Sequence, residues 1–235
     1  MNDAAGDFAE RAFFGRRRGK ALRAGQEEAL TAALEAWRFD PSAPPAGRAA
    51  LAATLGHARR LGLEIGFGGG EHFLHRLGED ETLGLIGVEP FVNSMAKCAA
   101  RLSEMPALAD RARLYDDDAI VVLDALPAGV LDIVWLLYPD PWPKTRHAKR
   151  RFTSADNIAR IARVLRPGAP FHVASDIPAY IDWTMRHVMA DGAFSFEAKG
   201  PEDWQTPYAG WPGTRYEAKA LREGRRPTYL TFRRR

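Results

Sequence analysis

Short apolar runs alternate with segments of helical apolar spacing along most of the chain. The strongest run covers residues 131–137, where only Asp132 interrupts the apolar side chains. Runs of this length, rich in large and β-branched residues, are typical of buried strands. By the same pattern we predict strands at residues 61–65, 83–88, 111–115, 131–137, 171–174, 194–197 and 228–232. The last two are expected to close the sheet in antiparallel fashion.

Helical patterns occupy most of the gaps between these runs. We predict helices at residues 48–60, 71–78, 92–104, 155–165 and 177–189, with Ser154 capping the fourth. Alternation of strands and helices at this spacing is typical of α/β proteins. We therefore expect a Rossmann-like, mostly parallel seven-stranded sheet with helices on both faces. The ligand crevice of such a sheet lies at the C-terminal ends of its strands.

The first 45 residues differ in composition from the rest. They are basic, punctuated by glycine, and end in a cluster of prolines at positions 41, 44 and 45. We therefore divide the chain into a basic N-terminal arm, residues 1–45, and a single domain, residues 46–235. The composition of the arm favours flexibility.

The distribution of charge along the chain is more informative about function than the net charge. The formal charge is only +3 over 235 residues, yet basic residues gather between Arg11 and Arg23, after Trp142, and at the C-terminus. Such local patches attract phosphate. Cys98 is the only cysteine, which excludes an intramolecular disulfide and a cysteine-rich metal site. With no signal peptide or membrane-length apolar run evident, we expect a cytoplasmic protein.

The stretch from residue 138 to 151 is the most informative about function. Prolines at positions 139, 141 and 143 surround Asp140 and Trp142 and restrict the backbone at the end of the strongest predicted strand. Five basic residues follow, Lys144, Arg146, Lys149, Arg150 and Arg151. A fixed carboxylate and indole beside phosphate-attracting charge indicate an enzyme that acts on a nucleic-acid base. The alternative is a structural Pro-rich turn followed by a solvated basic helix.

A glycine-rich turn follows the first predicted strand. Glu64 is followed by glycines at positions 66, 68, 69 and 70, and Glu89 ends the second predicted strand. An acidic residue at that place suits hydrogen bonds to ribose hydroxyls. The dinucleotide pattern would require glycine where Glu71 stands, and a carboxylate there disfavours a pyrophosphate. The turn therefore favours a nucleoside ligand without phosphate, such as a nucleoside that carries a positively charged sulfonium group.

This turn resembles the first motif of class I S-adenosylmethionine-dependent methyltransferases. The resemblance implies that the glycine-rich loop lies under the cofactor and that Glu89 holds its ribose. An aspartate after the third strand would lie at the adenine edge, and Asp116, Asp117 and Asp118 are all candidates, with Asp118 preferred.

Four further signatures resemble the bacterial tRNA (guanine-N7-)-methyltransferase family. They are Pro-Asp-Pro-Trp-Pro-Lys with the basic cluster after it, Ala-Ser-Asp at 174–176, Thr-Arg-Tyr-Glu at 214–217, and Gly-Arg-Arg-Arg-Gly-Lys at 15–20. The resemblance covers nearly the whole chain. It implies a class I methyltransferase fold and transfer of a methyl group from S-adenosyl-L-methionine to N7 of a guanosine in the tRNA variable loop. The implied partner is tRNA, and the enzyme is expected as a monomer or homodimer.

The resemblance also implies roles for individual residues. Cofactor contacts would come from Glu64, Gly66, Gly68, Glu89, Asp118 and Asp140. Substrate contacts would come from Lys144, Asp176, Thr214, Arg215, Tyr216 and Glu217. The RNA backbone would meet Arg146, Lys149, Arg150, Arg151, Arg16, Arg17 and Arg18. Asp140 is the predicted catalytic residue, while Asp176 has the alternative role of a helix N-cap.

Other readings remain open at this point. Residues 201–213 are rich in proline and tryptophan, so Trp204, Tyr208 and Trp211 either stack on RNA bases or pack as a surface loop. His72 and His75 lie one helical turn apart without an evident third ligand, so no metal is expected. The rival functions are methylation of an exocyclic amine, RNA binding without catalysis, and NAD-dependent oxidoreduction.

Overall fold

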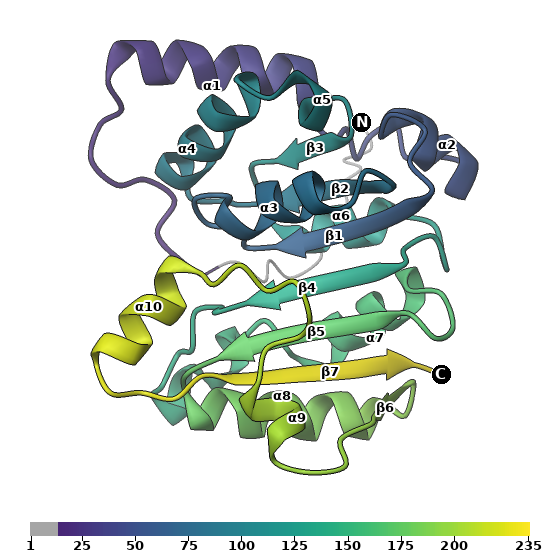
Figure 1. Cartoon of the computed structure of the whole chain (residues 1–235), viewed down its shortest axis with the longest axis vertical. Helices are drawn as coiled ribbons and strands as arrows, with labels where there is room; N and C mark the ends of the chain where they lie inside the picture. The colour runs from purple at the N-terminus through teal and green to yellow at the C-terminus, as the bar shows by residue number, and fades with distance from the viewer. Residues whose placement is uncertain (1–13) are drawn as a thin grey trace, which may run out of the picture.

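The computed structural model describes residues 14–235, and in that part of the chain seven strands form one sheet (Figure 1). The strands are β1 (Arg60–Ile65), β2 (Leu83–Val88), β3 (Ala112–Tyr115), β4 (Ile133–Leu137), β5 (Pro170–Ser175), β6 (Phe194–Phe196) and β7 (Thr228–Arg234). Their order is β3-β2-β1-β4-β5-β7-β6. Neighbours from β3 to β5 pair in parallel, whereas β7 is antiparallel to both β5 and β6. The predicted α/β fold class is confirmed.

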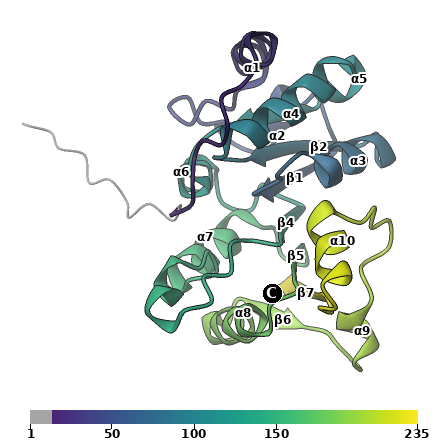
Figure 2. The ribbon, with the colours of Figure 1, turned by 90° about the vertical axis from the view of Figure 1, so that its left-hand side faces the viewer.

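Helices cover both faces of this sheet (Figure 2). One face carries α2 (Arg48–Thr54), α6 (Ala119–Ala125), α7 (Ala155–Val164) and α8 (Pro178–Asp191), which share one apolar cluster with the strands. The other face carries α1 (Ala24–Trp37), α3 (Glu71–Glu79), α4 (Val92–Ser103) and α5 (Pro106–Ala109), which share a second cluster. The remaining elements are the 3₁₀ helix η1 (Thr145–Arg150), α9 (Glu202–Gln205) and α10 (Arg215–Arg222). None of the helices between residues 14 and 235 has the length and apolar character needed to cross a bilayer.

Local sequence explains why the central elements form as predicted. All of β4 is buried, as is all of β2, because parallel strands are covered on both faces and therefore read as continuous apolar runs. Helix α7 begins at the predicted cap, where the Ser154 hydroxyl accepts a hydrogen bond from the N–H of Asn157. Ile158 and Ile161 then carry its apolar stripe into the core.

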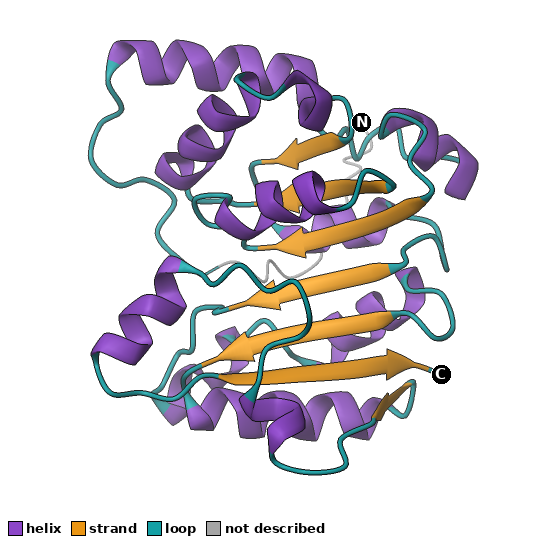
Figure 3. Ribbon diagram, in the orientation of Figure 1, coloured by secondary structure: helices purple, strands orange, loops and turns teal. Residues whose placement is uncertain are grey.

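The expected arm contains a helix that was not predicted from the sequence, drawn as the purple helix at the top of Figure 3. Helix α1 lies at residues 24–37 and packs against α4 and β3, with Leu30 and Ala33 buried. The expected boundary at residue 45 therefore does not separate this helix from the domain. Its packed face carries Leu30, Ala33, Leu34 and Trp37, but alanines also occupy its exposed side, which weakens the contrast between the two faces. Residues 1–13 of the expected arm, with Arg11, lie outside the described residues.

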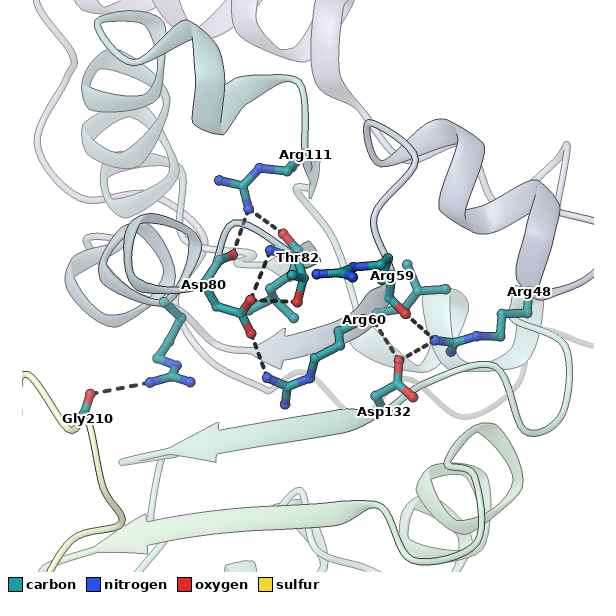
Figure 4. Close-up of polar contacts among 11 residues, drawn as sticks. Arg48, Arg59, Arg60, Asp80, Thr82, Arg111, Asp132 and Gly210 are labelled. Carbon is teal, nitrogen blue, oxygen red and sulfur yellow. Dashed lines mark hydrogen bonds and ion pairs between the residues drawn. The ribbon is translucent and has the colours of Figure 1, made fainter.

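Arginine–aspartate pairs tie together the N-terminal ends of the central strands (Figure 4). Arg48 contacts the Asp132 carboxylate at 2.6 Å, and the same carboxylate accepts the N–H of Leu61 at 2.8 Å. Arg60 pairs with Asp80 at 2.6 Å. The polar side chains at this end are thus paired with one another, and the opposite, C-terminal edge of the parallel strands carries the predicted site.

A histidine is buried in the centre of the sheet. His172 on β5 is 9% exposed and stacks on Trp135 of β4, with 6.3 Å between ring centroids. Its Nδ1 lies 3.0 Å from the hydroxyl of Thr231 on β7. Burial, with a smaller effect of the Arg233 charge, lowers the pKa of His172 to about 3. The imidazole is therefore neutral at physiological pH.

We expect this histidine to make stability depend on pH. Because its pKa is lower in the folded protein, the unfolded chain takes up the proton first, and the free energy of unfolding falls as pH drops from about 6.5 towards 3. The slope from this group is at most about 1.4 kcal/mol per pH unit. Urea unfolding of wild type and His172→Gln across that range should show a flatter curve for the variant. Parallel curves would contradict the assignment.

Candidate active site

A cavity of about 330 Å³ lies at the C-terminal ends of the parallel strands. Those strand ends point to one side of the molecule (Figure 1). The cavity wall contains Gly66 after β1, Glu89 after β2, Asp118 after β3, and Tyr138, Asp140 and Trp142 after β4, together with Phe14, Arg16, Arg150 and Tyr216. The predicted crevice is therefore present, and residues from four strand ends meet in it.

The glycine-rich turn approaches this cavity without side chains. Gly66 has φ +74°, and a Cβ built there would meet no atom within 4 Å, so its backbone faces open space. Gly70 has φ +80° and lies so close to α4 that an added Cβ would come within 2.5 Å of the sulfur of Cys98. The turn requires glycine at both positions, because one faces the cavity in a left-handed conformation and the other permits close helix packing. Burial raises the pKa of the Cys98 thiol.

Glu89 stands at the end of β2 as a buried carboxyl on the cavity wall. It accepts hydrogen bonds from the backbone N–H groups of Gly68 at 2.6 Å and Phe91 at 2.9 Å. Burial raises its pKa, and these two hydrogen bonds and the Arg215 charge act in the opposite direction. Gly68 contributes to the site through this backbone contact. The two backbone donors fix the orientation of the carboxyl group towards the cavity.

The three successive aspartates have different surroundings. Asp118 is 3% exposed, lines the cavity, and caps α6 by accepting the N–H of Ile120 at 3.0 Å. Asp116 pairs with Arg38 at 2.9 Å, and Asp117 pairs with Arg17 of the N-terminal arm. Of the three, Asp118 is the one on the cavity wall, in agreement with the preference stated from the sequence.

The turn after β4 has an unusual backbone. Tyr138 has φ +50° and Trp142 has φ +40°, so two bulky residues occupy the left-handed region on either side of Asp140. Such conformations are costly and persist where the surroundings determine them. Tyr138 was not among the predicted site residues, although it opens the Pro-rich stretch, and it stacks on Tyr216 with 6.4 Å between ring centroids. The strained turn thus supplies two aromatic walls of the cavity.

Arg151 holds this turn from inside the protein. It is 7% exposed, and its guanidinium donates to the carbonyl oxygens of Pro141 at 3.0 Å, Trp142 at 3.2 Å and Ala179 at 3.2 Å. It also lies over the Trp183 ring, 5.2 Å from its centroid. The sequence groups Arg151 with the RNA-contacting residues, but its donors are used within the protein. The structure therefore gives it the role of supporting the Asp140 turn.

Asp140 projects from the turn at the edge of the cavity. The residue is exposed, and among the described residues none donates a hydrogen bond to its carboxylate. Partial desolvation by the cavity wall nevertheless raises its pKa. A carboxylate with free acceptor positions, fixed at its backbone and open to a cavity, is suited to bind a donor group on a ligand.

The N-terminal arm contributes a wall of the same cavity. The backbone oxygen of Arg17 accepts the N–H of Val92 at 2.9 Å, and the N–H of Gly19 donates to Asn93 at 2.7 Å. Phe14 and Trp142 both face the guanidinium of Arg150, which lies 5.6 Å and 4.9 Å from their ring centroids. A segment distant in sequence, which the sequence pattern did not assign to the cavity, therefore lies over the Asp140 turn.

The remaining predicted residues fall into two groups. Lys144, Arg146, Lys149, Arg16 and Arg18 are exposed, as expected for contacts to a large ligand. Others are engaged within the protein: Asp176 pairs with Arg225 at 2.5 Å, Arg215 donates to Ser94 at 3.2 Å, Thr214 caps α10, and Glu217 accepts from Trp211, Thr214 and Tyr229. Asp176 is not a helix N-cap, because α8 begins after Ile177.

The segment 201–213 packs on the protein, as one of the two sequence readings proposes. Trp204 contacts Phe196 with 6.3 Å between ring centroids, and Tyr208 and Trp211 pack against the second core cluster. Glu64 lies beneath this segment, 2% exposed, with one carboxylate oxygen 2.7 Å from Nδ1 of His72. Within residues 14–235 no three His, Cys, Asp or Glu side chains are grouped for a metal ion.

Comparisons with known proteins agree with this arrangement. A family model described as "Putative methyltransferase" matches residues 58–230. A protein of Mesorhizobium japonicum is 56% identical over 94% of both chains, and one of Agrobacterium fabrum is 53% identical over the full length of both. Another, from Rhizobium meliloti, is 54% identical over the full length of both. All three relatives are named tRNA (guanine-N(7)-)-methyltransferase.

Solved structures support the fold. An antibiotic-related methyltransferase superposes with a TM-score of 0.56 at 14% identity, covering 80% of this chain and 94% of that one. A 16S rRNA (adenine(1408)-N(1))-methyltransferase variant from Catenulisporales acidiphilia, solved with SAM, superposes with a TM-score of 0.52 at 17% identity, covering 83% and 91%. At these identities the likeness concerns the fold alone.

The internal role of Arg151 can be tested without any ligand. Lysine keeps the positive charge but cannot reach three carbonyl oxygens in a fork, so we expect Arg151→Lys to lower the free energy of unfolding by about 1–3 kcal/mol. The matched control is Arg146→Lys in η1, where the side chain is exposed. Urea unfolding measures both variants. Equal stability of the two would show that Arg151 does not support the turn.

Proposed function

The chain belongs to the tRNA (guanine-N(7)-)-methyltransferase family, and we propose that it transfers a methyl group from S-adenosyl-L-methionine to N7 of a guanosine in the tRNA variable loop, forming 7-methylguanosine. Its place of action would be the cytoplasm. The structural observation that supports the proposal is a single cavity at the strand ends, whose wall includes Glu89, Asp118 and Asp140.

The residues of the cavity fit the proposed cofactor. Gly66 leaves open space at the backbone, where a nucleoside can approach closely. The Glu89 carboxylate, at the end of β2, suits the ribose hydroxyls, and Asp118 suits the adenine edge. A volume of about 330 Å³ lies within the usual range for small-molecule sites. When bound, S-adenosyl-L-methionine supplies a methyl group on a positively charged sulfur.

Asp140 is the proposed catalytic residue. Guanine N7 carries a free lone pair, so the transfer requires no general base and depends on alignment and electrostatics. The Asp140 carboxylate has free acceptor positions, which match the N1–H and exocyclic amino group of guanine. Those hydrogen bonds would orient the base and increase the electron density at N7. The strained backbone on both sides of Asp140 would keep the carboxylate in place before the base arrives.

The exposed basic residues are the proposed tRNA surface. Lys144, Arg146 and Lys149 are exposed on the turn and η1, and Arg16 and Arg18 are exposed on the arm. These charges flank the cavity, because Arg16 and Arg150 belong to its wall. Phosphate contacts here would offset the cost of extracting the target nucleotide from its tertiary contacts in tRNA, which is a few kcal/mol.

The direct test is methyl transfer from labelled S-adenosyl-L-methionine to unmodified tRNA, followed by nucleoside analysis. We expect 7-methylguanosine from the wild type and a kcat about 100-fold lower for Asp140→Asn, which keeps the shape but loses the negative charge. The control is cofactor binding, which should remain measurable in the variant. A methylated adenosine or an exocyclic methylamine would contradict the proposed target, and full turnover by Asp140→Asn would contradict its role.

The same variant should be more stable than the wild type. Because folding raises the pKa of Asp140, the folded protein holds this proton more tightly than the unfolded chain, and the free energy of unfolding falls as pH rises through that pKa. At pH 7 the ionised Asp140 carboxylate destabilises the folded protein to the full extent. Asparagine cannot ionise, so Asp140→Asn should have a higher Tm at this pH. Calorimetry at pH 7 checks the sign, and a lower Tm would contradict it.

Salt dependence tests the proposed RNA surface. Each phosphate contact releases counterions, so we expect Lys149→Ala to weaken tRNA binding at low salt and to reduce the slope of log K against log salt by about one. The control is Arg186→Ala on α8, where the side chain is exposed and pairs with Asp182 at 3.0 Å. Filter binding between 50 and 200 mM salt covers a useful range. An unchanged slope would show that Lys149 does not contact a tRNA phosphate.

A further inference from the structure

A chain of three polar side chains, two of them buried, links the segment before α10 to the end of β1. The Tyr208 hydroxyl is hydrogen-bonded to Nε2 of His72, and Nδ1 of His72 lies 2.7 Å from the carboxylate of Glu64. Glu64 and His72 are each 2% exposed. The contacts span 136 residues in sequence between His72 and Tyr208. Neither His72 nor Tyr208 has a part in the proposed reaction.

The protonation pattern of this chain follows from its geometry. Burial, together with the nearby Glu64 charge, raises the pKa of Tyr208, so its hydroxyl is neutral and can donate. Tyr208 then donates to Nε2 of His72, and Nδ1–H of His72 donates to Glu64. Because a carboxylate only accepts, Glu64 selects the tautomer of His72 that is protonated at Nδ1. The Tyr208 hydroxyl, which can donate, then binds the unprotonated Nε2 and stabilises this arrangement, in which His72 fixes one carboxylate oxygen of Glu64.

Aromatic rings keep water away from the central histidine. Trp135 and Trp211 lie 5.3 Å and 5.5 Å from the His72 ring, measured between centroids, and the Tyr208 ring lies 4.4 Å from that of His172. In such surroundings a hydrogen bond is stronger than in water, and an unpaired polar group is costly. The orientation of Glu64 thus depends on partners from the segment that carries Tyr208.

That segment is attached at several points. Figure 1 shows it crossing the sheet face on the side of α3, between α9 and α10. The carbonyl oxygen of Gly210 accepts hydrogen bonds from His75 at 3.2 Å and from Arg76 at 3.5 Å. The Trp211 indole donates to Glu217 at 2.8 Å. Tyr208 is therefore held over α3 by contacts that do not involve Glu64.

Glu64 reaches a small cavity beside the large one. This cavity, of about 10 Å³, is lined by Glu64, Glu71 and His72, among others, and shares Gly66, Tyr138 and Tyr216 with the main cavity. Its volume is close to the minimum that holds one water molecule, which is also the size of an ammonium group. Two carboxyl side chains on its wall favour a cation over a neutral or anionic group.

We propose that His72 and Tyr208 are positioning residues that orient the Glu64 carboxylate towards the ammonium group of the bound S-adenosyl-L-methionine. The proposal rests on the proposed function for the identity of the cofactor. The proposal gives the segment 201–213 a role in cofactor affinity, because its Tyr208 side chain contacts His72 on α3. Tyr208 lines neither cavity and acts through His72 and Glu64, whereas His72 lies on the wall of the small cavity and acts by holding Glu64.

The test is cofactor affinity by isothermal titration calorimetry, without tRNA. Tyr208→Phe removes one hydroxyl and keeps the ring, so we expect the Kd for S-adenosyl-L-methionine to rise about three- to tenfold. His75→Gln is the matched control, because it changes another contact of the same segment without breaking the chain to Glu64, and its Kd should change less than about twofold. Thermal unfolding of the free proteins verifies that both variants are folded.

A double-mutant cycle separates positioning from general packing. If Tyr208 acts through Glu64, Tyr208→Phe should change the Kd much less in a Glu64→Gln background than in the wild type. Nitrogen NMR of histidine-labelled wild type should show His72 protonated at Nδ1. An unchanged Kd for Tyr208→Phe, an equal effect in both backgrounds, an equal effect of His75→Gln, or protonation at Nε2 would each overturn the proposal. Failure of the wild type to bind the cofactor would instead overturn the proposed function on which it rests.

Discussion

The active-site geometry depends on three hydrogen bonds from the Arg151 guanidinium to the backbone of the turn and of α8. Tyr138 and Trp142 occupy left-handed conformations that cost roughly 1–3 kcal/mol each, and prolines alone do not select them. A buried planar cation with fixed donors offsets this strain and leaves Asp140 with no partner within the described protein. The ends of the parallel strands position the other walls of the cavity, so only the Asp140 turn depends on a separate set of contacts.

The central strands β1, β2, β4 and β5 could be predicted from sequence because they are buried on both faces and bounded by turn residues. Glu89 and Asp118 could be placed on the cavity wall because strand ends in a parallel sheet converge on one edge. Helix α1 was missed because alanines on its exposed side weaken the contrast with the packed face that Leu30, Leu34 and Trp37 form. Helix α10 was missed because its eight residues are mainly polar, with Glu217 and Ala220 buried.

The sequence shows which residues are charged but not whether their side chains point to solvent or into the protein. Arg150 and Arg151 are adjacent, yet one lies on the cavity wall between two aromatic rings and the other is buried under the turn. Likewise Glu217 reads as an exposed substrate contact in sequence but accepts hydrogen bonds from three residues of its own domain. Such assignments require the tertiary structure, because a 3₁₀ helix or a capping box turns consecutive side chains to opposite sides.

The close packing of α3 on α4 has a practical consequence for spectroscopy. Cys98, the single thiol of the chain, is enclosed where Gly70 approaches it, and its raised pKa leaves almost no thiolate to react. Maleimide chemistry on the native fold would therefore find no target of its own. A cysteine introduced in the N-terminal arm would accept a fluorophore or spin label without background, which makes the natural sequence ready for distance measurements between the arm and the domain.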